Sequence, residues 1–212
     1  MTAEVLVAAI LGGLLGLLAD RLSTRWPIHE DERVRSLDWR TVSVCLAGAA
    51  AFAVLAASWG EPRDLAILGL YTGALIVLLA TDLDQRLLPD LITLPLIGYA
   101  ALITILGLNP LLADKPLGLA SAVAAAVVTP TLLAVSDRVL KGALGMGDLK
   151  LSVSLGLMAG LSQLLVGFLV AATLFAAVVL VLLLARKLSL RTPIPFGPVL
   201  IGAGVLAMVV GT

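Results

Sequence analysis

The sequence predicts an all-α integral membrane protein, a polytopic bundle of about eight transmembrane helices. Its 212 residues are 60% hydrophobic and only 13% charged, whereas soluble domains average about 25% charged residues. Long apolar runs recur along the chain, and the stretches between them, about twenty residues at most, are too short to bury a separate core. The sequence therefore favours a single bundle embedded in a lipid bilayer.

The apolar runs define the expected helices, because a membrane-spanning helix needs about 20 such residues. In chain order the predicted spans are 3–19, 41–58, 64–81, 91–108, 117–136, 148–160, 163–185 and 196–211. The first is expected to be retained, since the N-terminal stretch lacks a basic start and a small-residue cleavage site. The sixth is short, and Gly160 is expected to form the turn that follows it. We expect one domain, in which residues 1–40 form the first helix and a short basic loop and residues 41–212 the rest of the helix bundle.

The basic residues are distributed unevenly between the two sides of this eight-span plan. Of the 14 Lys and Arg residues, only Arg63 and Lys115 fall on one side. Because the more basic side normally faces the cytoplasm, both termini are expected on the extracytoplasmic side. The end of the third span and the start of the sixth then lie together at the cytoplasmic face. Cys45 is the only cysteine, which excludes an intrachain disulfide and a cysteine zinc cluster.

Two polar motifs interrupt the apolar runs at these positions. The stretch "LLATDLDQRLLPDLITLP" carries Asp82, Asp84 and Asp90, and "GALGMGDLKLSVSLG" carries Asp148. Ionisable groups at the ends of transmembrane helices are candidates for function. Two carboxylates brought close together share a proton, and such a pair can activate water and polarise a carbonyl group. The alternative is that each acid only caps a helix or lies among the lipid headgroups.

Several neighbouring residues could shape such a site. Gly145 and Gly147 precede Asp148, and glycines without side chains let helices approach closely. Asp84 lies about 200° around the helix from Asp82, so it either shapes the site from another face or is solvated. Lys150 could pair with one of the catalytic carboxylates or with lipid phosphate, or extend to the interface.

Two further features carry simpler expectations. Asp90 follows Pro89 and is expected to be the N-cap of the fourth helix. The segment "TPIPFGPVL" contains Pro193 and Pro195 and cannot form a regular helix throughout. It is either a stiff loop or the lining of a substrate cleft, where non-helical backbone is tolerated at membrane depth.

Three of these motifs together resemble the type IV prepilin leader peptidase family, membrane aspartyl proteases with a glycine-x-glycine-aspartate motif. They are "TDLDQRLLPDLITLPL", "GMGDLKL" and "TPIPFGPVL", in the order that the family has them. The resemblance implies that Asp82 and Asp148 are the catalytic pair, with no metal and no cofactor. It also implies a prepilin or pseudopilin-like substrate, whose basic leader reaches a multi-pass enzyme of the bacterial cytoplasmic membrane from the cytoplasm. No nucleic-acid partner is expected.

The resemblance has one large departure. The bifunctional members carry a cysteine-containing cytoplasmic domain after the first helix and methylate the new N-terminus. Here that region is only "RLSTRWPIHEDERVRSLDWR", so neither zinc nor methyltransferase activity is carried over, and the chain is similar to the short, peptidase-only members.

Other functions stay open at this stage. A presenilin-like intramembrane aspartyl protease shares the glycine-x-glycine-aspartate motif. A membrane carrier and a non-enzymatic scaffold belong to different classes, and carriers place their acids near the bilayer midplane rather than at one edge.

Overall fold

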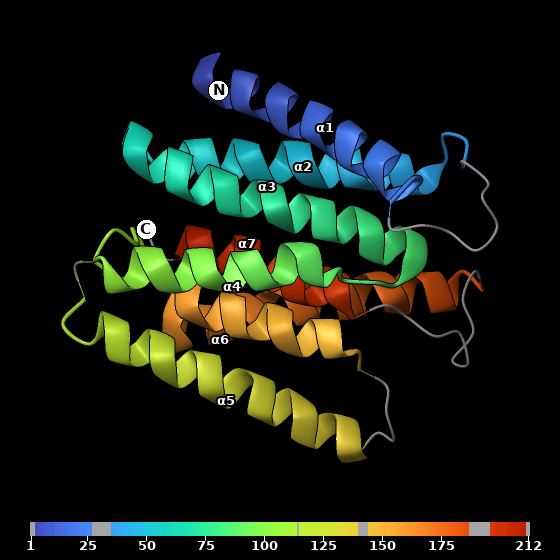
Figure 1. The fold of residues 1–212 in the computed structure, drawn as a ribbon. Coiled ribbons are helices and arrows are strands. Elements are labelled where there is room, and N and C mark those ends of the chain that lie inside the picture. The colour runs from blue at the N-terminus through green and yellow to red at the C-terminus, as the bar shows by residue number, and fades with distance from the viewer. Residues whose placement is uncertain (1–2, 27–34, 114, 140–143, 187–195, 211–212) are drawn as a thin grey trace.

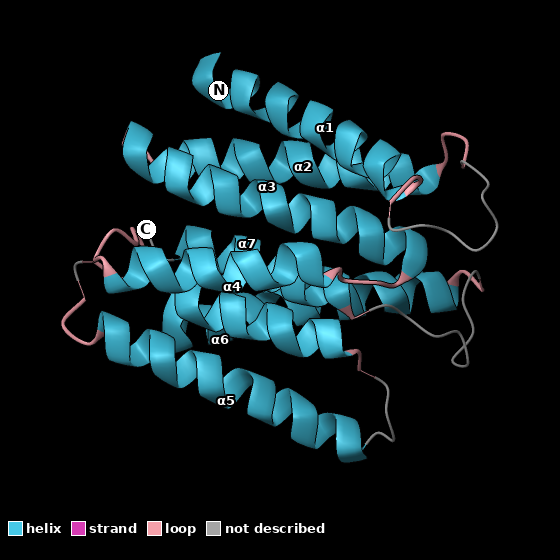
Figure 2. Ribbon diagram, in the orientation of Figure 1, coloured by secondary structure: helices cyan, strands magenta, loops and turns pink. Residues whose placement is uncertain are grey.

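The computed structural model describes residues 3–26, 35–113, 115–139, 144–186 and 196–210. Within these ranges every regular element is a helix, which confirms the predicted all-α class, as Figure 2 shows. The helices are α1 (Ala3–Ser23), α2 (Trp39–Ser58), α3 (Pro62–Gln85), α4 (Asp90–Ile105), α5 (Gly118–Val139), α6 (Met146–Leu184) and α7 (Gly197–Val210). Five of them are long and apolar enough to cross a membrane, and α4 and α7 are shorter apolar helices.

The helices form two groups that pack against each other, α1–α3 in one and α4–α7 in the other (Figure 1). Helix α3 belongs to the core of the bundle, because Leu68, Tyr71 and Leu75 along its length are fully buried. The Tyr71 hydroxyl lies 2.6 Å from Ser154 Oγ in α6, a buried polar contact between the two groups. Buried hydroxyls in an apolar core need such partners, so this pair helps to set the register of α3 against α6.

Helix α6 contains a sharp change of direction at Gly160, the residue where the sequence predicted a turn. Its φ of 70° and ψ of 175° are not helical, and glycine adopts this region at little cost because it has no Cβ. Leu155 packs on Gly204 of α7, while Gly167 packs on Ala203 and Ala207 of the same helix. In a straight helix, positions 155 and 167 would be about 18 Å apart. The part of α6 after Gly160 therefore folds back along the first part (Figure 1).

One end of the bundle collects the acidic motifs, and we call it the carboxylate end. There α3 finishes near Asp82, α4 begins at Asp90 and α6 begins at Met146. Helix α7 begins at the same end, because Gly197 contacts Asp82. At the opposite end the Asn109 amide donates to the carbonyl of Met158 (2.8 Å), which anchors the α4–α5 connection beside the reversal in α6.

Candidate active site

Asp82 lies in the last turn of α3 and points into the bundle. The helix ends at Arg86, whose left-handed φ of 54° and ψ of 40° allow its N–H to donate to the Asp82 carbonyl at 2.9 Å. The Asp82 residue is only 5% exposed. Its Oδ2 atom is buried and has no hydrogen-bond partner. A carboxylate oxygen in this condition is costly in a structural role, which points to a role in binding or chemistry.

Asp148 lies in the first turn of α6, three residues after the N-cap Gly145. Its Oδ2 atom accepts a hydrogen bond from the Gly145 N–H at 3.0 Å, so the carboxylate does contribute to the helix cap. The other oxygen, Oδ1, is buried without a partner. One oxygen thus fixes the orientation of the side chain while the other stays available.

The fold brings these two carboxylates together. Asp148 is 9% exposed, and it is close enough to Asp82 for the two charges to interact. Gly147 is the residue that permits this approach, because a Cβ on it would lie 2.7 Å from Leu88 Cβ. The start of α6 therefore packs directly against the segment that leaves α3. The predicted close approach at a glycine is present, and its neighbour is the α3–α4 connection.

A contact that the sequence did not predict covers Asp82 from the other side. Gly197, the first residue of α7, packs so closely that a Cβ there would lie 2.5 Å from Asp82 Oδ2. The only sequence signal is a glycine between Phe196 and Pro198, next to the proline-rich motif. Helices α3, α6 and α7 thus all contribute backbone or side chains around the Asp82 carboxylate.

Asp84 points to a different group of charges, away from the Asp82–Asp148 pair. Its carboxylate forms an ion pair with Arg35 Nε at 2.9 Å and accepts a hydrogen bond from Arg40 Nη1 at 3.0 Å. Arg35 also pairs with Asp20 of α1 at 2.5 Å and with Asp38 at the start of α2. Of the two alternatives for Asp84, the solvated one is wrong, because its side chain is only 4% exposed, and a role in shaping the site stays a prediction. Asp84 belongs to an ionic network that joins α1, α2 and α3.

The expectation for Asp90 was also wrong. Pro89 is the N-cap of α4 and no side chain caps the helix there. The Asp90 carboxylate instead lies 2.6 Å from Lys150 Nζ. Lys150 therefore pairs with neither carboxylate of the Asp82–Asp148 pair, and its bond ties the start of α4 to the first turn of α6. Pro193 and Pro195 lie outside the described residues.

Each carboxylate of the pair has one buried oxygen without a partner. Paired carboxyl groups are the side chains that acid–base chemistry of the aspartyl-protease kind uses. In the part of the chain that the structure describes, no cluster of three or more His, Cys, Asp or Glu side chains could hold a metal ion.

Comparisons with known proteins agree with the motifs. A model of the type IV leader peptidase family matches residues 69–182, a range that holds both Asp82 and Asp148. The chain belongs to the type IV leader peptidase family. This confirms the resemblance drawn from the three sequence motifs.

The related proteins carry a common name. A prepilin leader peptidase/N-methyltransferase of Aeromonas hydrophila is 34% identical over 191 residues, which cover 90% of this chain and 60% of that protein. A protein of the same name from Dickeya chrysanthemi is 33% identical over 82% of this chain and 61% of its own length. The chain spans about half to three fifths of the length of the curated relatives it matches. No solved structure matches the chain.

Proposed function

We propose that this chain is a prepilin-type leader peptidase, an aspartyl endopeptidase of the bacterial cytoplasmic membrane. One observation carries the proposal: in a member of this family, two buried carboxylates from distant motifs interact, and each has an oxygen without a partner. The substrate is a prepilin or pseudopilin-like protein with a basic leader before a hydrophobic helix. Family membership favours this function over a carrier or a scaffold.

In the proposed mechanism the carboxylate pair shares one proton and acts as both base and acid. The ionised member takes a proton from a water molecule, and the resulting hydroxide attacks the carbonyl carbon of the scissile peptide bond. The protonated member donates its proton to the carbonyl oxygen. The tetrahedral intermediate then collapses and the C–N bond breaks. The leaving amine receives the proton that the first carboxylate took from water. Asp82 and Asp148 titrate as a coupled pair in this scheme, so neither has a fixed role.

The proposal includes an arrangement in the membrane. The reversal at Gly160 divides α6 into two segments, which supports eight crossings and both termini on the extracytoplasmic side. The carboxylate end also holds Arg21, Arg40, Arg86 and Lys150, so the positive side of the molecule and the proposed site coincide. We therefore propose that the site lies at the cytoplasmic face, where a basic leader is accessible. The proposed activity is leader cleavage alone, without the methyltransferase activity that the names of the relatives include.

A leader-cleavage assay tests the function directly. A tagged prepilin is co-expressed with the parent chain, with Asp82→Asn or with Asp148→Asn, and the N-terminus of the product is read by mass spectrometry. We expect cleavage by the parent and none by either variant at equal abundance. Asp64→Asn is the matched control, because Asp64 lies in the first turn of α3, at the opposite end of the same helix. Cleavage that survives either Asp82→Asn or Asp148→Asn would overturn the proposed mechanism.

A further inference from the structure

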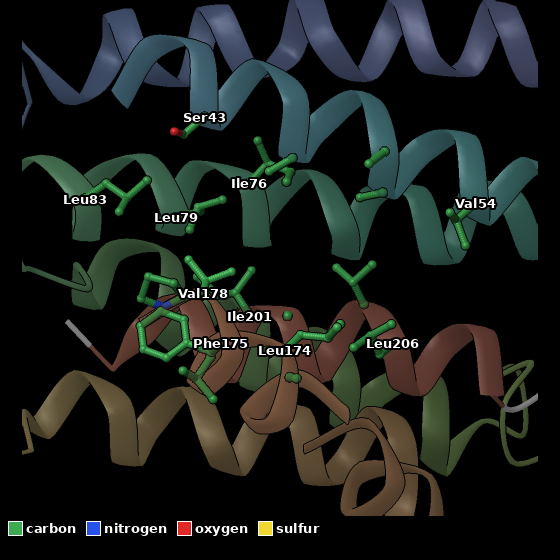
Figure 3. Close-up of a pocket in the computed structure, with 18 of the residues that line it drawn as sticks. Ser43, Val54, Ile76, Leu79, Leu83, Leu174, Phe175, Val178, Ile201 and Leu206 are labelled. Carbon is green, nitrogen blue, oxygen red and sulfur yellow. The ribbon is translucent and has the colours of Figure 1, made fainter. Parts of the chain in front are cut away.

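An apolar groove of about 510 Å³ runs along the bundle between the two helix groups. Figure 3 shows residues of α2 and α3 on one wall and residues of α6 and α7 on the other. Among the described residues that line it, Ser43 alone has a polar side chain, and its hydroxyl already donates to the Trp39 carbonyl at 2.8 Å. The groove therefore suits an apolar occupant.

The groove is open at its side. Helices α2 and α6 face each other across it, yet no Cα atom of α2 lies within 8 Å of a Cα atom of α6. Val54 on one wall and Leu174 and Val178 on the other are exposed. A helix moving within the plane of the membrane could enter through this gap without opening the bundle.

One end of the groove lies beside the turn of α3 that carries Asp82, although Asp82 itself does not line it. Leu83 and Pro198 line it, and they directly follow Asp82 and Gly197, the two residues in contact across the α3–α7 interface. From Pro198 the lining continues along α7 as far as Val209, a distance of about 16 Å or three helical turns. The groove thus leads from Asp82 into the depth of the bilayer.

The wall formed by α2 suits a helix better than lipid tails. Ala47, Ala50 and Ala51 line the groove there, opposite Gly202 of α7. Small residues at such positions let a second helix approach closely, and close packing is the main source of helix association in lipid. Lipid tails gain little extra packing from small residues, because flexible tails can fill an apolar gap of any shape.

We propose that this groove binds the hydrophobic N-terminal helix of the substrate and so sets the position of the scissile bond. The inference rests on the proposed function and deepens it. With the helix in the groove, its cytoplasmic end lies at Asp82, and the peptide bond between the leader and the helix meets the carboxylate pair. The position of the substrate helix in the groove determines which peptide bond reaches the carboxylate pair. The leader then needs only an extended conformation across the site.

Site-specific photo-cross-linking tests the inference. Benzoylphenylalanine replaces Ala50 in the groove or, as a control, Val127, which is 61% exposed on α5 and outside the groove. Each variant is co-expressed with a tagged prepilin, irradiated in membranes, and its adducts are mapped by mass spectrometry. We expect position 50 to form an adduct with the hydrophobic helix of the prepilin and position 127 to form none.

A cleavage measurement on bulky variants accompanies the cross-linking. Ala50→Trp fills the groove, and we expect its KM for the prepilin to rise at least about tenfold while Val127→Trp stays within about twofold of the parent. Adducts of position 50 with lipid or a second copy only, or an unchanged KM for Ala50→Trp, would overturn the groove proposal while the parent still cleaves. Failure of the parent itself to cleave prepilin would overturn the proposed function, and this inference with it.

Discussion

Two sets of buried carboxylates lie at the same end of this bundle and have opposite surroundings. Asp20 and Asp84 are held by Arg21, Arg35 and Arg40. In the described part of the chain neither Asp82 nor Asp148 forms an ion pair, and each keeps an unpartnered buried oxygen. Burying a charge is tolerable when it is paired and hydrogen-bonded and costly when it is not. The first set is paired as a stabilising network would be, whereas the second keeps unpaired buried oxygens, as the proposed catalytic role requires.

The sharpest test of this contrast compares Asp148→Asn with Asp20→Asn. We expect Asp148→Asn to reduce cleavage by about 10²- to 10⁴-fold, the range for loss of a catalytic acid or base. Its Tm in detergent should be at least as high as that of the parent, because the substitution removes an unpaired buried charge. Asp20→Asn should lower the Tm, because it leaves Arg35 with a weaker partner in the buried network. An equal loss of Tm in both variants would contradict the distinction.

Substitution of Arg35, which pairs with both Asp20 and Asp84, is expected to give the next largest effect, a loss of stability. Arg35→Met leaves Asp20 and Asp84 without their shared partner, and breaking a buried ion pair in this way costs about 3 to 5 kcal/mol. We expect a cost at the lower end of this range, since Arg35 is 17% exposed. The measurement is the decrease in the free energy of unfolding in detergent or lipid. The double variant Arg35→Met with Asp84→Asn should recover part of the loss. No recovery would indicate that packing of the Arg35 side chain, rather than its charge, stabilises the network.

Much of the fold was accessible from the sequence, because helix position follows from local apolar runs. The predicted spans overlap every observed helix, and the interruption at Gly160 was expected from a glycine in a long apolar run. The two carboxylates were found for the same reason, since charge is rare in such runs. Local patterns could not predict two contacts at the carboxylate end, that of Gly197 with Asp82 and that of Arg35 with Asp84. They join residues far apart in the chain, and no local pattern specifies which side chains meet.

The contact between Gly197 and Asp82 predicts that a side chain added at position 197 lowers the cleavage activity. Gly197→Ala forces its new methyl group against the carboxylate, so α7 or the Asp82 side chain must move, at a cost of about 1 to 3 kcal/mol. We expect cleavage to fall about two- to tenfold if half of that cost falls on the position of Asp82. Gly98→Ala in α4 is the matched control, because a Cβ there has no neighbour within 4 Å. Equal activities for the two variants would show that the site adapts to the added methyl group.

The smallest effect concerns Asp38, the N-cap of α2. Burial raises the pKa of its carboxyl, but hydrogen bonds from Arg35 and from the N–H groups of Thr41 and Arg40 lower it by more, so the net pKa lies below its ordinary value. A lowered pKa adds stability above the unfolded pKa, and this stability is lost as the pH falls through the folded pKa.

We therefore expect Asp38→Asn to cost about 1 kcal/mol or less at pH 7. The Tm values of parent and variant should converge as the pH decreases below about 4. A difference that persists unchanged in acid would assign the effect to cap geometry instead of charge.

The lengths of the helices around Asp82 and Asp148 have a consequence for the surrounding lipid. Helix α4 has 16 residues and α7 has 14, so they measure about 24 and 21 Å, and the segment of α6 before Gly160 also measures about 21 Å. The hydrocarbon layer of a bilayer is about 30 Å thick. Hydrophobic mismatch of this size is relieved by local thinning of the bilayer. Under the proposed function, such thinning brings the aqueous phase closer to the two carboxylates, a route for the hydrolytic water that needs no channel through the bundle.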